Sequence, residues 1–340
     1  MSVVIPCRNE AGHVGRCLDS ILSSDYPLDR LEVVIADGMS DDGTREVVAR
    51  YVAMHPSITM IDNPKRITPC GMNLAIRAAR GQVIIRMDAH AMYPTDYLRR
   101  LVAAQQETGA ENVGTVIETL PADDTAVAAA VAVGLSHPLG VGNSHFRVGT
   151  ATRRWVNHVP FGCWRRELFD RIGMFDEEMV RDQDVEFNGR LLNSGGRILL
   201  LPDVVSRYWG RRTIGQLARM MYQYGYFKPL VARKNGKILT VRQLVPSLFV
   251  LALAGSLALA PWWRWAGVGL GLLLAAYGAL IGVTAVRAAK RQGARVAVAL
   301  GGVFPAMHVS YGVGYLRGLL DHFVRARKAR RPAAEVALSR

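Results

Sequence analysis

The chain has 340 residues, half of them hydrophobic, which is enough for one large domain or two with a sizeable core. Its cysteines, at positions 7, 17, 70 and 163, lack the spacing of a metal site or a disulfide framework, so reduced thiols are expected. The formal net charge is +14 but is spread unevenly along the chain, and such asymmetry indicates a basic part that meets nucleic acid or an anionic membrane.

The first 90 residues predict alternating strands and helices. No basic stretch followed by an apolar core opens the chain, so no secretory signal is expected. Apolar runs predict the strands, and apolar residues at helical spacing predict the helices. The predicted strands are 3–5, 32–36, 57–61 and 83–87, and the predicted helices are 14–22, 44–54 and 69–80. This order favours a parallel, doubly wound sheet.

Polar side chains follow two of these strands. Asp37 begins a carboxylate-rich turn, and Asp88 and His90 follow the strand 83–87. Ligands bind beyond the carboxyl ends of strands in open α/β sheets, so these residues mark a candidate site. Asp88 and His90 could hold Mn²⁺ or Mg²⁺ against a diphosphate, or could be a solvated strand end. A Rossmann dinucleotide site and a P-loop are not expected, because neither glycine pattern occurs.

A second group of carboxylates lies at 181–187, with the sequence Arg-Asp-Gln-Asp-Val-Glu-Phe, where a helix is predicted to begin. A carboxylate near a helix start can act as a general base. It can also cap the helix and complement its dipole. Both readings apply to Asp182 and Asp184.

Positive charge gathers in the C-terminal part of the chain. Residues 1–205 contain 21 Lys and Arg and 26 Asp and Glu. Residues 206–340 contain 21 Lys and Arg but only 2 Asp and Glu. Two uncharged apolar runs, 244–260 and 265–286, are each long enough to cross a bilayer as a helix. The basic part is therefore expected to meet a membrane and not nucleic acid. Tryptophans in the connection between the two runs suit the membrane interface.

A third apolar run, 296–316, contains Pro305 and His308, and the sequence leaves open whether it crosses the membrane. Two crossings put the basic segments 233–242 and 287–295 in the cytoplasm, whereas a third crossing would put the basic cluster 325–331 outside. Glycines 267, 269 and 271 suit close helix packing. The expected regions after residue 225 are a basic juxtamembrane linker at 226–243, a membrane region at 244–320 and a basic tail at 321–340.

Several motifs together resemble the family 2 glycosyltransferases, which are inverting enzymes with the GT-A fold. They are Val-Ile-Pro-Cys-Arg-Asn-Glu at 4–10, Ala-Asp-Gly-Met-Ser-Asp-Asp-Gly-Thr at 36–44, Asp-Ala-His at 88–90, and the segment 161–177. With Asn-Pro-Lys-Arg at 63–66 and the membrane tail, Asp-Ala-His is similar to the succinoglycan-type exopolysaccharide glycosyltransferases. The implied fold class is α/β, with a GT-A domain at 1–225, Rossmann-like and doubly wound with a mixed sheet, followed by C-terminal transmembrane helices.

The resemblance also implies roles for individual residues. The expected nucleotide-binding residues are Pro6, Arg8, Glu10, Asp37 and Asp88. Asp37 would face the uracil, and Asp88 with His90 would hold the divalent cation. The family usually has a carboxylate at the position of His90, and imidazole there favours Mn²⁺ over Mg²⁺. Lys65 and Arg66 could offset diphosphate charge or be solvated, and Asn73 matches an Asn of the family.

The same resemblance implies that Asp184 is the catalytic base, with Gln183 in place of the usual Glu. Asp182 is the other candidate, and Glu186 is expected to orient the loop or the acceptor. Gln216 and Arg219 are similar to the family's Q-x-x-R-W acceptor motif, with Met in place of Trp, which favours transfer of single sugars. The alternative for this segment is an amphipathic helix at the membrane surface.

The sequence therefore predicts a membrane-bound inverting glycosyltransferase. It would move a hexose, with glucose expected, from a UDP-sugar to a polyprenyl-diphosphate-linked sugar acceptor in exopolysaccharide or cell-envelope glycan synthesis. It would be a multi-pass protein of the inner (cell) membrane, with a cytoplasmic catalytic domain and a basic part that meets anionic lipids. The alternatives are a polyprenyl-phosphate glycosyl transferase and a non-catalytic nucleotide-binding membrane scaffold.

Overall fold

The computed structural model describes residues 1–238 and 240–324, and the chain forms two compact units. The first unit consists of Met1–Glu118 and His145–Tyr208. The second unit consists of Thr119–Ser144 and the chain from Trp209 onward. The domain limits expected from the sequence stay predictions. The basic cluster expected at 325–331, like most of the tail expected at 321–340, lies outside the described residues.

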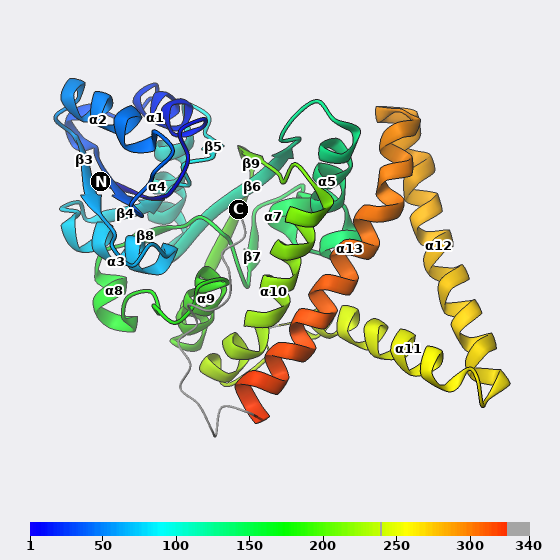
Figure 1. Ribbon diagram of the computed structural model, residues 1–340. Coiled ribbons are helices and arrows are strands. Elements are labelled where there is room, and N and C mark those ends of the chain that lie inside the picture. The colour runs from blue at the N-terminus through cyan, green and yellow to red at the C-terminus, as the bar shows by residue number, and fades with distance from the viewer. Residues whose placement is uncertain (239, 325–340) are drawn as a thin grey trace. The chain divides into compact units, whose positions relative to one another are not determined.

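The first unit is built on a nine-stranded mixed sheet with the order β3-β2-β1-β4-β8-β6-β9-β5, in which β7 also pairs with β9 (Figure 1). Strands β1, β2, β3 and β4 are parallel, whereas β8 runs antiparallel to β4 and to β6. The strands are β1 (Ser2–Cys7), β2 (Glu32–Asp37), β3 (Ile58–Asp62), β4 (Val83–Arg86), β5 (Ala91–Met92), β6 (Asn112–Leu120), β7 (Arg154–Val156), β8 (Cys163–Arg165) and β9 (Ile198–Trp209). The expected GT-A architecture with a mixed sheet is confirmed.

Helices cover both faces of this sheet. Successive side chains of a strand point to opposite faces, so strands that are apolar throughout present an apolar surface on each face, and each surface needs helices to cover it. On β1, Val3 and Ile5 enter one hydrophobic core and Val4 enters the other. The first core includes α1, whose apolar face Val14, Cys17, Leu18 and Ile21 is buried. The helices of this unit are α1 (Val14–Leu22), α2 (Thr44–Met54), α3 (Thr68–Ala78), α4 (Tyr97–Thr108), α7 (His145–Val148), α8 (Glu167–Ile172) and α9 (Gln183–Asn193).

The second unit is helical and contains the apolar C-terminal segments. Three of its helical segments are long and apolar enough to cross a membrane, namely Val241–Leu259, Arg264–Gln292 and Ala294–Val324. In each segment we consider an apolar stretch of 18 residues. The buried share of that stretch is 6% in each of the first two segments and 33% in the third. The helices are α5 (Ala126–Ser136), α6 (Pro138–Val141), α10 (Ile214–Asn235), α11 (Val245–Leu259), α12 (Arg264–Gln292) and α13 (Ala294–Leu319). The protein is therefore membrane-associated.

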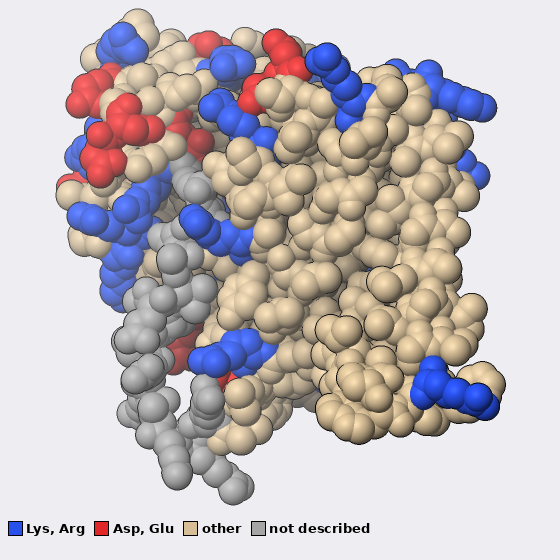
Figure 2. Space-filling view, turned by 45° about the vertical axis from the view of Figure 1, so that its right-hand side comes forward, with Lys and Arg blue, Asp and Glu red and all other residues tan. Residues whose placement is uncertain are grey.

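The exposed side chains of α11 and α12 are predominantly apolar, as expected for helices that face lipid. Large exposed apolar residues on these helices include Leu248, Leu251, Leu257, Leu272 and Leu280. Figure 2 shows a broad surface on which Lys, Arg, Asp and Glu are nearly absent. The connection between the two helices leaves Trp262 84% exposed, which agrees with a position at the membrane interface.

Helices α10 and α13 lie side by side and approach closely at glycines (Figure 1). A Cβ atom added to Gly314 or to Gly318 would lie 2.2 Å from a backbone oxygen of α10. The glycines expected to pack helices closely were wrongly chosen: an added Cβ at Gly269 or Gly271 would meet nothing within 4 Å, and at Gly267 only Ala260 at 3.9 Å. Close packing in the described chain therefore involves α10 and α13.

Candidate active site

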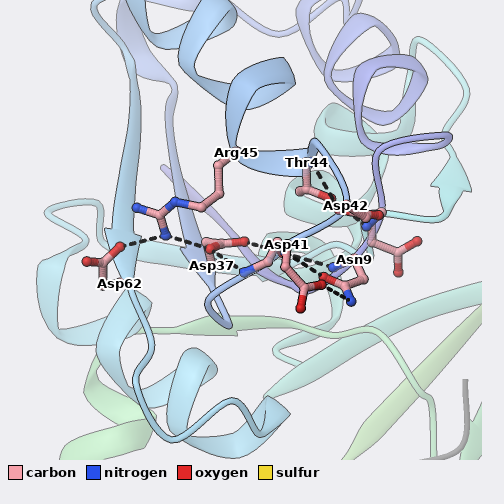
Figure 3. A network of polar contacts seen from close by, with 9 residues as sticks. Asn9, Asp37, Asp41, Asp42, Thr44, Arg45 and Asp62 are labelled. Carbon is pink, nitrogen blue, oxygen red and sulfur yellow. Dashed lines mark hydrogen bonds and ion pairs between the residues drawn. The ribbon is translucent and has the colours of Figure 1, made fainter.

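Two loops at the carboxyl ends of β1 and β2 are joined by hydrogen bonds (Figure 3). Asn9 donates from Nδ2 to Oδ1 of Asp41 at 2.9 Å and accepts the Asp41 backbone N–H at 3.1 Å. The next residue, Glu10, donates its backbone N–H to Oγ1 of Thr44 at 2.7 Å. These contacts fix the loop that carries Arg8 and Glu10, directly after Pro6 and Cys7 of β1, against the turn that begins at Asp37.

Asp37 is fully buried at the end of β2, and its carboxylate already has protein partners. It accepts hydrogen bonds from Arg45 at 2.7 Å and from the Ser40 hydroxyl at 2.5 Å (Figure 3). Arg45 also pairs with Asp62 at 2.9 Å. Asp37 therefore anchors the turn, and its expected contact with uracil stays a prediction.

Arg8 packs tightly against Gly38 of the turn after β2, and Pro6 is in ordinary contact with Gly71 of α3. A Cβ atom added to Gly38 would lie 3.1 Å from Cβ of Arg8, and one added to Gly71 would lie 3.6 Å from Cβ of Pro6. The structure thus brings Pro6, Arg8 and Asp37 together at one edge of the parallel strands, where a nucleotide is expected to bind.

His90 is paired with Glu10. Its Nδ1 lies 2.8 Å from Oε1 of Glu10, and its ring centroid is 4.7 Å from that of Tyr208. Burial alone would lower the pKa of His90, but Tyr208 and the Glu10 carboxylate outweigh it and raise the pKa to about 9. At neutral pH the ring is therefore a cation that links the loop after β1 to the segment between β4 and β5.

The two expected metal ligands differ in how well they fit a cation. Asp88 offers carboxylate oxygen, which hard divalent cations prefer, and its side chain is 16% exposed. His90 fits less well, because imidazole nitrogen suits these hard cations less than oxygen does and its Nδ1 is already bound to Glu10. Within residues 1–238 and 240–324, no group of three or more His, Cys, Asp or Glu side chains is placed so that it could hold a metal ion. The role of His90 as a ligand stays a prediction.

Arg86 is a buried cation that the sequence analysis did not assign to the site. Its NH2 group donates to Oδ1 of Asp88 at 3.1 Å, whereas Nε and NH1 are buried without a hydrogen-bond partner. Burial would lower the pKa of Arg86, but Asp88 and then Asp184 raise it. The guanidinium is thus hydrogen-bonded to Asp88, which follows β4, and its pKa is also raised by Asp184 of α9. A charged residue within an apolar strand was the signal in the sequence.

Asp184 lies in the first turn of α9, with its side chain 19% exposed. Its Oδ1 accepts the backbone N–H of Val185 at 3.0 Å, and its Oδ2 lies 4.0 Å from Nε2 of His158. Asp182 occupies the N-cap position with a φ of 57°, but its side chain makes no capping hydrogen bond. The expectation that Asp182 caps the helix through its side chain is therefore wrong.

The loop before α9 is held by side chains on both of its flanks. Glu186 is buried and forms a two-point ion pair with Arg190, at 2.6 and 2.9 Å. Arg190 in turn donates to the carbonyl oxygens of Ile172 and Met174 at 2.5 and 2.7 Å. Glu186 thus supports the loop through Arg190, and its expected contact with the acceptor stays a prediction.

On the other flank, Asn73 forms two hydrogen bonds with the backbone of Phe175, at 2.8 and 2.9 Å. Its Nδ2 also lies 3.1 Å from Glu177, which pairs with Lys65 at 2.6 Å. The hydrogen bond from Lys65, followed by those from Asn73 and Cys70, lowers the pKa of Glu177 to about 2. The charge of Lys65 is therefore compensated by a carboxylate of the protein.

Gln216 and Arg219 belong to the second unit, on α10. Gln216 forms a capping box with Thr213, in which its side chain accepts backbone N–H groups and its own N–H binds Oγ1 of Thr213. Arg219 is exposed one turn further along the helix. Their expected role in acceptor binding stays a prediction.

Comparisons with known proteins agree with this architecture. Residues 2–165 match the model of glycosyl transferase family 2. Succinoglycan biosynthesis protein ExoA of Rhizobium meliloti (strain 1021) is 32% identical over 335 residues, which cover 94% of each chain. Dolichyl N-acetyl-alpha-D-glucosaminyl phosphate 3-beta-D-2,3-diacetamido-2,3-dideoxy-beta-D-glucuronosyltransferase of Methanococcus voltae is 28% identical over 243 residues, covering 69% of this chain and 74% of the relative.

Among solved structures, the mannosyltransferase PcManGT from Pyrobaculum calidifontis, in complex with GDP-Man and Mn²⁺, has a similar fold. The TM-score is 0.56 at 22% sequence identity, and the match covers 94% of this chain and 87% of that one.

Proposed function

This chain belongs to glycosyl transferase family 2, and from that membership we propose an inverting transfer of a hexose from a UDP-sugar to a lipid-linked sugar acceptor at the membrane. One observation carries the proposal: Asp88, after β4, and Asp184, in the first turn of α9, both raise the pKa of the buried Arg86 guanidinium, which is hydrogen-bonded to Asp88. An inverting transferase needs such a pair, with one carboxylate on the side of the donor and one as a base.

In the proposed reaction a hydroxyl oxygen of the acceptor attacks the anomeric carbon of the donor hexose. The bond from that carbon to the diphosphate oxygen breaks, and UDP leaves with the bonding electrons. Asp184 takes the hydroxyl proton, as a positioned general base does. A divalent cation bound at Asp88 would supply positive charge to the departing diphosphate.

The proposed acceptor and cellular role have support from the relatives. The R. meliloti relative, similar over nearly the whole chain, is named for succinoglycan biosynthesis, and the name of the M. voltae relative includes a sugar linked to dolichyl phosphate. We therefore propose a polyprenyl-diphosphate-linked sugar as acceptor and glucose as the transferred hexose, in exopolysaccharide or cell-envelope glycan synthesis. The apolar α11 and α12 support attachment to a membrane. We propose that this is the inner membrane, that the chain crosses it more than once, and that the catalytic unit lies in the cytoplasm and meets anionic lipids.

A donor screen tests the proposal. Full-length protein in detergent is incubated with a panel of UDP- and GDP-sugars, and release of the nucleoside diphosphate is measured with and without a membrane lipid extract. We expect UDP-glucose or another UDP-hexose to be used, with a stimulation by the extract that Asp184→Asn abolishes. The proposal would be contradicted if only GDP-sugars were used, or if Asp184→Asn released as much nucleoside diphosphate as the wild-type protein.

A further inference from the structure

A chain of polar side chains runs through the first unit and ends at Asp184. Asn112, on β6, donates from Nδ2 to Oδ1 of Asn188 at 2.8 Å. Nδ2 of Asn188, on α9, lies 2.9 Å from Nδ1 of His158 and 2.9 Å from the carbonyl oxygen of Val159. Nε2 of His158 then lies 4.0 Å from Oδ2 of Asp184. Both asparagines are at most 1% exposed.

These contacts determine which ring nitrogen of His158 carries the proton. The carbonyl of Val159 can only accept, so the atom of Asn188 that faces it must be the amide nitrogen. That nitrogen has two hydrogens, and the second points at Nδ1 of His158. Nδ1 is therefore the acceptor, and in the neutral ring the proton lies on Nε2, which faces Asp184.

The same geometry excludes His158 itself as the base. Its only lone pair is already bonded to Asn188, so the ring has no free nitrogen that could take a proton from the acceptor hydroxyl. The ring packs edge-on against Phe146, with centroids 5.4 Å apart, which limits its rotation. His158 is thus suited to donate a hydrogen bond to Asp184. Such bonds are often long without substrate and shorten in the reacting complex.

We propose that His158 is a positioning residue for the base, and that Asn188 fixes the tautomer it needs. The Nε2–H group of His158 faces Oδ2 of Asp184 at 4.0 Å, while the backbone N–H of Val185 binds Oδ1. When the acceptor binds, the Nε2–H group closes on Oδ2 and orients the carboxylate for proton transfer. This inference rests on the proposed function, because it takes Asp184 as the base.

Two substitutions at one position separate a positioning role from a packing role. His158→Phe keeps a planar ring but removes the donor, whereas His158→Gln keeps an amide N–H close to the position of Nε2. Loss of a hydrogen bond to a charged group should lower kcat of His158→Phe by about 10- to 100-fold. KM for the donor should change by less than about twofold, because the lost contact acts on the base and not on donor binding. His158→Gln should recover most of kcat.

Asp184→Asn, measured beside these variants, distinguishes the two possible failures. If Asp184→Asn is inactive while His158→Phe turns over like wild type, the positioning role is wrong and the proposed function stands. If Asp184→Asn is active, the assignment of the base is wrong. A wild-type kcat in His158→Phe together with a low kcat in His158→Gln would mean that the ring acts by packing, and equally low kcat in both variants would refute a role for the Nε2–H group.

A spectroscopic measurement tests the tautomer without activity and remains available if His158→Phe does not fold. Full-length protein with ¹⁵N-labelled histidine, compared with His158→Gln to assign the signals, should show His158 neutral and protonated at Nε2 near pH 7.5. A ring protonated at Nδ1, or at both nitrogens, would overturn the inference.

Discussion

Replacing Asp184 with Asn should stop sugar transfer and leave the fold intact. The amide keeps the size of the side chain and removes the charge that accepts the proton. Asp184 is 19% exposed, and an amide oxygen can still accept the N–H of Val185, so the structural change is small. Turnover should fall by about 10²–10⁴-fold, the usual contribution of a positioned base. This corresponds to roughly 3–5 kcal/mol of activation free energy. Affinity for UDP should hardly change.

Asp182→Asn is the matched control two residues earlier. Its side chain makes no capping hydrogen bond that the substitution could remove. The backbone at Asp182 is left-handed, with a φ of 57°, and Asn tolerates this conformation as well as Asp does. We therefore expect a change of about 1 kcal/mol or less in the free energy of unfolding, and turnover close to that of wild type.

Single-turnover transfer and UDP titration on the full-length protein measure both variants. Near wild-type transfer by Asp184→Asn together with an inactive Asp182→Asn would mean that the base is Asp182. If neither substitution lowers turnover, the reasoning about a base fails. The polyprenyl-phosphate alternative would then be favoured, because a phosphate nucleophile is already ionised at neutral pH.

Three further predictions follow from other parts of the chain. Transfer should need a divalent cation, with Mn²⁺ at least as effective as Mg²⁺; full activity in excess chelator, or in Asp88→Ala/His90→Ala, would contradict the metal site. Carbonate-washed membranes should retain the protein, and reporters fused after Lys237 and Lys290 should both read cytoplasmic; a periplasmic signal at either would refute the topology. Gly318→Ala should destabilise the second unit by about 1–3 kcal/mol in thermal unfolding, since its Cβ would meet a backbone oxygen at 2.2 Å; an unchanged melting temperature would contradict the close packing of α10 and α13.

The parallel half of the fold could be predicted because its signals are local. The predicted strand 32–36 and helix 44–54 differ from β2 and α2 by at most one residue at either end. The antiparallel strands are harder to predict: β5 has two residues and β8 has three, too few for a periodic pattern. Their pairing depends on partners distant in sequence. The grouping of α5 with the C-terminal helices in one compact unit depends on such contacts too.

For the site, the sequence indicated carboxylates at strand ends and at a helix start, but not the partners of these carboxylates. Asp37 and Asp88 were found because ligands bind beyond strand ends. The pairing of Asp37 with Arg45 joins the end of β2 to the start of α2, and that of His90 with Glu10 joins two loops, so no periodic pattern in the sequence reports them. His158 was missed for the same reason, since a lone His in a connecting segment carries no signal until α9 places Asn188 beside it.

The contacts around Asp184 indicate a site that is arranged before substrate binds. Asn73 and Arg190 hold the backbone before α9 from opposite flanks, and Arg86 lies on a strand in the middle of the sheet. Burying Arg86 with two unpartnered donor groups opposes folding by about 1–3 kcal/mol for each. Groups that oppose folding in this way are concentrated at functional sites, where fixed charges stabilise a transition state without reorganising. Substitutions of the supporting residues Asn73 and Arg190 should therefore lower turnover more than donor affinity.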